Sequence, residues 1–507
     1  MIRFTIAFIF LSTICFAQTS LKEIQLENGS YTVGFKHFIV NDSSRTYTRA
    51  SDWNGKAVYR PISVSIWYPG TIDPRVRMAS TSVLDYMRIL KEEEEWEHLP
   101  DEQILNWFYY SNSPDNQRHL SERSAAYRNL TPVGETFPVI VYSASYQASS
   151  IENFLLCEYL ASHGYIVISA PSLGTNTKPL EGGTVKDMET QARDAEFLIK
   201  EALKNKQADA NNIALMGFSF GGMSNSLVKM RNGMIKAIVS LDGSERYQYA
   251  TLSKSPYFNP DRINVPYIHL SQKEIPKDIM EEQKLDPRLN TEFLLYDTLK
   301  NSKAYKLKLH HMTHAYFSTL GVLFNERDKR QDKSDEEIMG SYRLMSRYAL
   351  TFLNAYLKND SKGLAFLSKH PESNDIESGL VSKEVKNPIV KSFRFEDFNN
   401  IAKSRQYNGL DELSEQLVKQ YPGFKLSEGS LNNLGLQLLF NKETSDNGIK
   451  VFLFATTLYP KSANLFDSLA EGYLYVGNKA LAISNFKKSL SLDPSNQNAI
   501  NRLKELE

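Results

Sequence analysis

The chain has 507 residues, of which 41% are hydrophobic and 23% charged. This composition is ordinary for a globular protein, and the length favours two domains. Lysine plus arginine number 59, as do aspartate plus glutamate, so the formal net charge is zero. This balance argues against a nucleic-acid partner, which would require a basic surface.

Residues 1–17 have the pattern of a secretory signal peptide. Arg3 gives the positively charged N-terminal region, residues 4–16 form a short and mostly apolar stretch, and the small Ala17 suits the last position before a cleavage site. The pattern predicts an exported protein, either periplasmic or extracellular. No later segment is long and apolar enough to be a transmembrane span, so none is expected.

The two cysteines bear on anchoring and on redox chemistry. Cys15 as the attachment point of a lipid is an alternative to a cleaved signal, but the bulky Ile14 before it argues against a lipoprotein. Cleavage would leave Cys157 as the remaining cysteine, so no internal disulfide is expected. Cys157 lies in an apolar run and is predicted to be a small buried side chain.

Residues 76–130 separate two early strands, expected at 31–40 and 60–68, from the rest of the first domain. This insertion holds helical stretches, several aromatic residues and the charge run Lys91–Glu95, which is expected on a solvated helix face. Two interpretations stay open: a lid over an active site, or a surface embellishment. An apolar substrate pocket would be shaped by residues 76–130 and 244–300.

From residue 137 onward, short apolar strands alternate with helices. Such strands are typical of a parallel sheet with both faces covered, so the predicted class is α/β, with a doubly wound, mostly parallel sheet. Strands are expected at 138–142, 165–169, 212–216, 235–241, 265–270 and 304–309, and helices at 152–163, 188–204, 222–230, 316–324 and 340–357.

The C-terminal part contains related segments 34 residues apart. Tyr459-Pro460 and Asp493-Pro494 end similar stretches, and residues 448–452 match residues 482–486. This spacing resembles the tetratricopeptide repeat, a helix pair that packs closely through small residues. The resemblance implies an all-α repeat domain, which commonly binds a protein partner.

The predicted domains are therefore 21–375 and 390–507. The boundary is expected between residues 375 and 390, in the polar stretch around Lys383–Asn387.

The sequence Gly217-Phe-Ser-Phe-Gly221 is a G-x-S-x-G motif between a predicted strand and a predicted helix. That context is the one a nucleophile elbow requires, because the serine must stand on a sharp turn between close-packed elements. Ser219 is therefore the predicted nucleophile. The start of the following helix also favours developing negative charge.

A serine nucleophile needs a histidine base further along the chain in this fold. His314 follows the strand 304–309 by a short loop and precedes an apolar helix, which is where the base belongs. The neighbouring His310 and His311 are competitors. The other histidines of this region are less favoured: His269, inside a strand, and His370, in a polar segment.

The base in turn needs an acid that orients it. Asp242 directly follows the strand 235–241 and precedes a glycine. Glu274, after the next strand, is the main alternative, since many hydrolases of this type carry their acid there.

These motifs resemble the platelet-activating factor acetylhydrolase and dienelactone-hydrolase-like family of α/β-hydrolases. The features are the run 217–222, Asp242 in Ser-Leu-Asp-Gly, Thr313-His314 before an aromatic helix, and the opening strands at 31–35 and 64–69. The resemblance covers about residues 30–360. It implies a catalytic triad of Ser219, Asp242 and His314.

The same resemblance implies an oxyanion hole made by two backbone amides. One belongs to Phe220, and the other lies in the loop after the strand 139–142, where Tyr146 holds the corresponding position. That loop commonly reads His-Gly-x-Gly in the family, but here it reads Ala144-Ser-Tyr-Gln147. Without the two glycines, the backbone conformations open to the turn that orients the Tyr146 amide are restricted.

The sequence thus predicts an exported serine hydrolase that cleaves a carboxylic ester, a small or lipid-like molecule, through an acyl-enzyme, with no cofactor and no metal. The alternative is a repeat-based protein-binding module whose hydrolase domain is weak or inactive. An amide or carbon–carbon bond is a further option, because the triad does not itself select the scissile bond.

Overall fold

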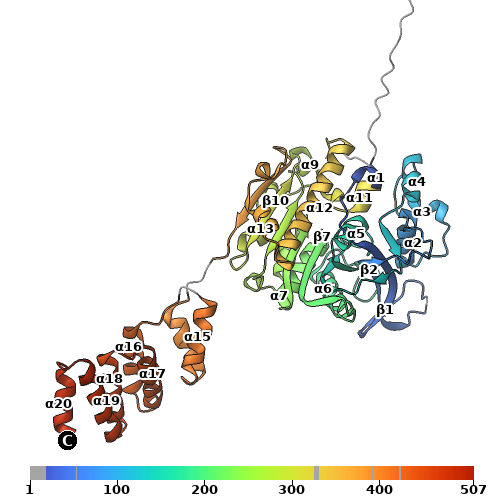
Figure 1. Cartoon of the computed structure of the whole chain (residues 1–507). Helices are drawn as coiled ribbons and strands as arrows, with labels where there is room; N and C mark the ends of the chain where they lie inside the picture. Colours follow the sequence, from blue (N-terminus) through green and yellow to red (C-terminus); the bar gives the residue numbers. More distant parts are fainter. Residues whose placement is uncertain (1–18, 53, 325–330, 390–392, 422–423, 507) are drawn as a thin grey trace, which may run out of the picture. The chain divides into compact units, whose positions relative to one another are not determined.

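The computed structural model describes residues 19–52, 54–324, 331–389, 393–421 and 424–506. The predicted signal peptide and Cys15 lie outside these residues. The chain divides between Ile389 and Val390 into two units, which we call the sheet unit and the helical unit (Figure 1). Among the described helices, none combines the length and hydropathy that a membrane span requires.

The sheet unit is built on an eleven-stranded sheet in the order β11-β10-β9-β8-β7-β5-β6-β2-β1-β3, with β4 paired to β2. The six central strands, β10, β9, β8, β7, β5 and β6 in sheet order, are parallel to one another. β11 pairs antiparallel with β10 at one side of this block, and β2 pairs antiparallel with β6 at the other. The strands are β1 (Thr32–Thr48), β2 (Ala57–Thr71), β3 (Ala126–Arg128), β4 (Thr131–Pro132), β5 (Phe137–Ser143), β6 (Ile166–Ala170), β7 (Ala208–Phe218), β8 (Ile235–Leu241), β9 (Tyr267–Ser271), β10 (Ala304–Leu309) and β11 (Val381–Lys386).

Alternate side chains of the central strands enter two separate cores, as the pleat of a strand requires. In β5, Ile140 and Tyr142 belong to the core under α5 (Phe154–Ser162), α11 (Thr319–Phe324) and α12 (Asp335–Leu357). Val139 and Val141 belong to the core under α6 (Val185–Ala202) and α7 (Phe220–Arg231). Helices therefore cover both faces (Figure 1), and the predicted α/β class with a doubly wound, mostly parallel sheet is confirmed.

Shorter helices surround this framework: α1 (Leu21–Ile24), α2 (Val83–Glu93), α3 (Ile104–Trp107), α4 (Pro114–Ser121), α8 (Tyr249–Ser253), α9 (Lys277–Glu282), α10 (Leu294–Thr298) and α13 (Ser361–Ser368). In α5, Cys157 is fully buried, as predicted, and burial raises the pKa of its thiol. A thiol in that state behaves as a small hydrophobic group.

The sheet unit extends beyond residue 375, where the sequence analysis ended it. β11 pairs antiparallel with β10 along its whole length, from Val381 opposite Leu309 to Lys386 opposite Ala304. Because β11 is an edge strand with one exposed side, it is rich in charged residues, and the polar stretch read as a linker is part of the sheet.

The insertion at 76–130 is tied to the sheet rather than separate from it. Its last residues form β3, which pairs with β1. The run Lys91–Glu95, expected on a solvated face, is partly buried: Lys91 donates to the carbonyl of Leu99 at 2.7 Å, and Glu93 accepts hydrogen bonds from the 149–150 loop. Charged side chains are buried here because each has polar partners.

The helical unit consists of consecutive helices, and from Glu428 onward each helix packs against the next one along the chain. In the pair α16 (Glu428–Leu439) and α17 (Ser445–Leu458), a side-chain carbon added to Gly435 would lie 2.6 Å from the ring of Phe452. One added to Gly448 would lie 2.9 Å from the carbonyl of Gly435. Close packing therefore depends on these glycines. The helices are α14 (Phe395–Ser404), α15 (Leu410–Gln420), α16 (Glu428–Leu439), α17 (Ser445–Leu458), α18 (Ala463–Tyr475), α19 (Lys479–Leu492) and α20 (Gln497–Leu506).

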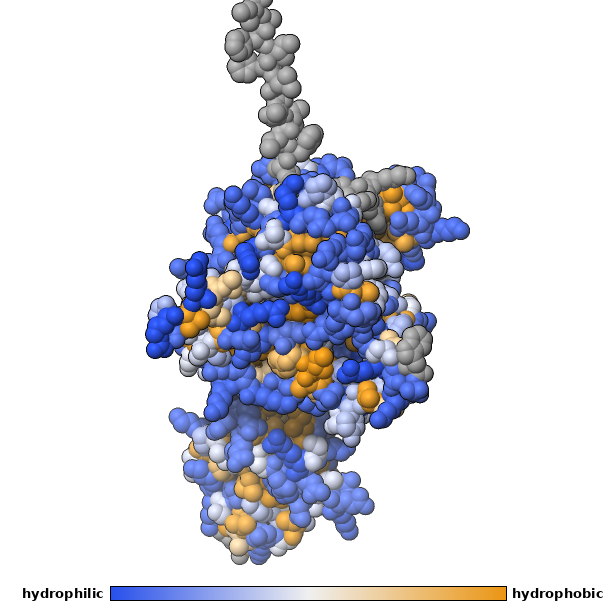
Figure 2. All heavy atoms as spheres, turned by 90° about the vertical axis from the view of Figure 1, so that its right-hand side faces the viewer, coloured by the Kyte–Doolittle hydropathy of each residue, from blue (hydrophilic) through white to orange (hydrophobic). Residues whose placement is uncertain are grey.

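The surface of the sheet unit on the side of α2 to α4 is largely hydrophilic, with hydrophobic residues in small, separate groups (Figure 2). Scattered exposed apolar residues of this kind are normal on a globular protein.

Candidate active site

Ser219 stands at the junction of β7 and α7, with φ 52° and ψ −118°. A non-glycine residue rarely adopts this backbone conformation, which costs about 1–3 kcal/mol and persists where the surroundings enforce it. The surroundings are tight: a side-chain carbon on Gly221 would lie 2.0 Å from the carbonyl oxygen of Ser143, and one on Gly217 would lie 2.5 Å from the backbone of Gly221. The glycines of the motif are thus required by close packing of β7, α7 and the end of β5.

Ser219, His314 and Asp242 lie in one hydrogen-bonded chain. The distance from His314 Nε2 to Ser219 Oγ is 2.9 Å, and the distance from His314 Nδ1 to Asp242 Oδ2 is 2.6 Å. Asp242 follows β8, and His314 begins a short 3-10 helix (His314–Phe317) after β10. All three residues therefore sit at the carboxyl edge of the parallel sheet, where ligands of open α/β folds bind.

Asp242 is completely buried, which by itself would raise the pKa of its carboxyl group. The hydrogen bond and charge of His314, together with the guanidinium of Arg246, outweigh burial, and the pKa is lowered. The carboxylate is therefore ionised in the pH range in which histidine titrates, and it can hold an imidazolium.

Two residues that sequence reasoning missed fix the Asp242 carboxylate. The Tyr247 hydroxyl lies 3.0 Å from both carboxylate oxygens, and the Gln272 backbone N–H donates to Oδ1 at 3.1 Å. The Gln272 side chain also accepts from the His314 backbone N–H at 3.0 Å and donates to the Tyr247 hydroxyl at 2.7 Å. The position of Gln272 just after β9, at the carboxyl edge of the sheet, could have marked it as a site residue, whereas no sequence pattern marks Tyr247.

The competing residues have other partners. Glu274 forms an ion pair with Lys308 at 2.9 Å, His310 contacts Ser382 at 3.2 Å, and His311 lies 3.9 Å from the carboxylate of Glu337. His269 is buried against Glu245 at 3.3 Å, and His370 pairs with Glu372 on the surface. The structure thus brings His314 and Asp242, and not these alternatives, to Ser219.

The loop after β5 lies beside the nucleophile. Its Tyr146 ring stands edge-on to the ring of Phe220, with centroids 5.7 Å apart, and its hydroxyl accepts from the Gly182 N–H at 3.1 Å. Phe220 is the first residue of α7, so its N–H has no acceptor within the helix. Among the described residues, no hydrogen-bond acceptor is found for the Tyr146 N–H either. These are the two amides named from the sequence.

Side chains hold this loop in place of the missing glycines. Ser145 donates its N–H to Glu152 at 2.9 Å and its hydroxyl to the same carboxylate, and the Gln191 side chain donates to the carbonyl of Ala144 at 2.7 Å. Gln147 carries the positive φ of 56° that the turn requires. Burial raises the pKa of Glu152 to about 6, against the lowering effect of its hydrogen bonds.

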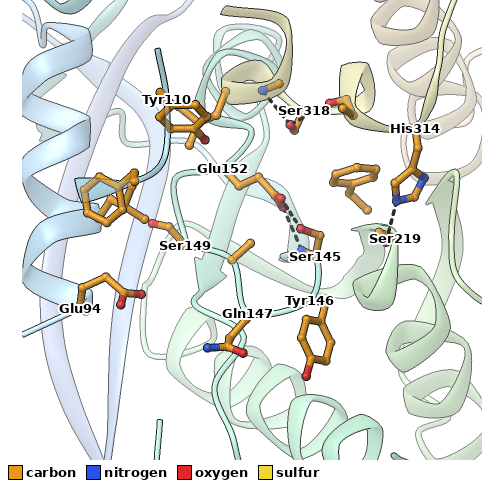
Figure 3. A pocket seen from close by; sticks show the side chains of 17 residues that line it. Glu94, Tyr110, Ser145, Tyr146, Gln147, Ser149, Glu152, Ser219, His314 and Ser318 are labelled. Atoms are coloured by element: carbon orange, nitrogen blue, oxygen red, sulfur yellow. Dashed lines mark hydrogen bonds between the residues drawn. The ribbon is translucent and has the colours of Figure 1, made fainter. Parts of the chain in front are cut away.

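A cavity of about 460 Å³ opens over Ser219. Ser219 and His314 lie at one end of it, the loop 145–149 and Glu152 in the middle, and Glu94 at the far end (Figure 3). Leu90, Glu94, Phe108 and Tyr110 come from the insertion, so the insertion forms one wall. None of the described lining residues falls within 244–300, so the expectation that this segment shapes the pocket was wrong.

The strand order, the elbow and the position of the site at the carboxyl edge of the sheet define an α/β-hydrolase fold. A family model described as chlorophyllase matches residues 126–244, a segment that includes Ser219 and Asp242. No curated protein matches the sequence. Among solved structures, a ferulic acid esterase from Streptomyces cinnamoneus is 17% identical, over 71% of this chain and 98% of that one, with a TM-score of 0.46.

Proposed function

We propose that the chain is an exported serine hydrolase that cleaves a carboxylic ester through Ser219, His314 and Asp242. The observation that carries the proposal is the position of His314 at the edge of an open cavity, with Nε2 2.9 Å from Ser219 Oγ and Nδ1 2.6 Å from Asp242 Oδ2. The match to the chlorophyllase family model supports ester hydrolysis as the reaction.

In the proposed mechanism, His314 Nε2 takes the proton of Ser219, and Ser219 Oγ attacks the ester carbonyl carbon. The N–H groups of Phe220 and Tyr146 stabilise the oxyanion, and the alcohol leaves with the proton from His314. Water activated by His314 then releases the acid from the acyl-enzyme. Asp242 holds the imidazole tautomer and stabilises its protonated form throughout.

The finer parts of the proposal come from the sequence. Export depends on the signal pattern at residues 1–17. The resemblance of the motifs to the acetylhydrolase family is a further reason to propose a carboxylic ester as the substrate. The triad chemistry does not choose between an ester and another scissile bond, so the substrate bond must be tested directly.

Labelling by a fluorophosphonate tests the nucleophile. The full chain is expected to gain one adduct, which mass spectrometry should locate on Ser219, and the Ser219→Ala variant should gain none. Hydrolysis of a short-chain nitrophenyl ester by wild type, with the Ser219→Ala variant as the control, tests the activity. An adduct on another residue, or equal hydrolysis rates for wild type and Ser219→Ala, would contradict the proposal.

A second candidate function belongs to the helical unit, which we propose to be a tetratricopeptide-type module that binds a protein. The specific observation is the edge-on pair of Phe440 and Tyr475, whose ring centroids are 6.0 Å apart although the residues are 69% and 45% exposed. Exposed aromatic residues are favoured at interfaces. A pull-down of cell-envelope proteins on wild type and on a Phe440→Ser, Tyr475→Ser double variant tests it. Identical captured sets would count against this candidate.

A further inference from the structure

The cavity over Ser219 is acidic from its middle to the end away from the nucleophile. Glu94 and Glu152 line it, and the described lining residues include no lysine or arginine. Behind this wall, the buried Glu93 accepts hydrogen bonds from Ser149 and Ser150. Any part of a substrate that fills the cavity from Ser219 toward the insertion therefore approaches the carboxylates of Glu152 and Glu94 (Figure 3).

Among the described residues, the cation paired with Glu94 is Lys178. Lys178 forms an ion pair with Glu94 and lies 5.1 Å from the centroid of the Trp96 ring. It balances only part of the local negative charge, since Glu93, Glu94 and Glu152 are all close to the cavity wall. Burial also lowers the pKa of Lys178 to about 8, so its charge weakens at mildly alkaline pH.

The remaining lining is suited to an uncharged polar molecule. Ser145, Gln147, Ser149 and Ser318 add hydroxyl and amide groups, whereas Leu90, Phe108 and Phe218 add apolar surface. Glu94 is 21% exposed at its side chain and can accept a hydrogen bond from a hydroxyl group of a ligand. A carboxylate or phosphate in the same place would be repelled by the charge of Glu94.

We propose that this cavity takes esters whose acyl arm is uncharged and ends in a hydrogen-bond donor such as a hydroxyl group, and that Glu94 rejects acyl arms ending in a carboxylate or phosphate. The inference rests on the proposed function, because it assigns the substrate class of the same site. It makes Glu94, which lies in the insertion and away from the reacting atoms, a specificity-determining residue.

The test compares methyl esters that differ only at the far end of the acyl arm: methyl hexanoate, methyl 6-hydroxyhexanoate and monomethyl adipate. With the full chain at pH 8, kcat/KM for the hydroxyl-ended ester should exceed that for the carboxylate-ended ester by at least about fivefold. Glu94→Gln should narrow this ratio, and Lys178→Gln should widen it. Glu281→Gln removes a carboxylate that also pairs with a lysine but is exposed on α9, so it is the matched control and should leave the ratio unchanged.

Nitrophenyl acetate, which has no acyl arm to reach Glu94, separates the two levels of the proposal. If it is not hydrolysed, the proposed function itself fails. If it is hydrolysed but the methyl esters show no preference, or the preference survives unchanged in Glu94→Gln, the inference is overturned and the proposed function stands.

Discussion

Ser145 donates both its backbone N–H and its hydroxyl to the buried carboxylate of Glu152, with a distance of 2.9 Å from N to Oε2. The Ser145 amide is therefore occupied, whereas the neighbouring Tyr146 amide is the one that we propose to bind the oxyanion. The backbone carbonyl of Glu152 also accepts from the N–H of Leu320, in the segment that follows His314. Glu152 thus links the loop 144–147, which we propose to hold the oxyanion, to the segment that follows His314, the proposed base.

This link predicts that Glu152→Ala lowers kcat for a short-chain nitrophenyl ester by about ten- to a hundredfold, because the loop loses the carboxylate that aims its amide. KM should change less, since ground-state contacts remain. Glu189→Ala is the matched control, as Glu189 also accepts from a serine hydroxyl, that of Ser255 at 2.9 Å, but away from the site. Equal kcat values for the two variants, with melting temperatures near that of wild type, would show that Glu152 does not position the loop.

The choice of acid gives a second prediction. Asp242→Asn should lower kcat by about a thousandfold or more, because an amide neither fixes the required imidazole tautomer nor stabilises the imidazolium. Glu274→Gln should keep kcat within about twofold of wild type, because Glu274 pairs on the surface with Lys308. Steady-state kinetics of both variants decide the matter; a large loss in Glu274→Gln alone would reverse the assignment.

The sheet could be predicted because its central strands are buried on both faces and therefore read as continuous apolar runs. The expected strand at 235–241 is β8, and that at 304–309 is β10. β11 escaped prediction for the opposite reason: an edge strand carrying Lys383, Glu384 and Lys386 looks like a linker.

The candidate site divides in a similar way. The spacing of Ser219, Asp242 and His314 reflects strand ends that the sequence displays, so their juxtaposition could be anticipated. Glu152 and Tyr247 act through contacts that no local pattern encodes. Glu152 lies at the start of a predicted helix, and Tyr247 lies in the irregular segment after β8. Such supporting residues become visible only when the chain is folded.

Glu93 gives a pH-dependent prediction. Burial raises the pKa of its carboxyl group to about 7, from an ordinary value of 4.5, despite hydrogen bonds from Ser149 and Ser150 that lower it. Because the folded-state pKa is the higher one, the stability that protonated Glu93 contributes is fully present below pH 4.5 and is lost as the pH rises through 7. Relative to wild type, Glu93→Gln should therefore gain about 2–3 kcal/mol in the free energy of unfolding between pH 5 and pH 8.

Denaturant unfolding at a series of pH values measures this difference. Glu93 and its partners Ser149 and Ser150 belong to the sheet unit, so the intrinsic fluorescence of this unit is a suitable signal for its unfolding. The matched control is Glu281→Gln, which removes an exposed carboxylate. A difference from wild type that does not change with pH, or that changes equally in the control, would contradict the role given to burial of Glu93.

Substitution of two glycines in α16 tests how closely the helices of the helical unit pack. A methyl group at Gly435 would lie 2.6 Å from the buried Phe452 ring, whereas one at Gly429 would meet nothing within 4 Å. Gly435→Ala should destabilise the unit by about 1–3 kcal/mol through overpacking. Gly429→Ala should stabilise it by about 0.5–1 kcal/mol, because alanine loses less backbone entropy in a helix.

Hydrogen–deuterium exchange on the full chain separates these effects, because peptides of the sheet unit serve as the internal reference. Faster exchange in α16 and α17 is expected for Gly435→Ala, and unchanged or slower exchange for Gly429→Ala. Equal exchange in the two variants would mean that α16 and α17 do not pack through Gly435. The small-residue contact, which is the physical basis of the tetratricopeptide resemblance, would then be absent from this pair of helices.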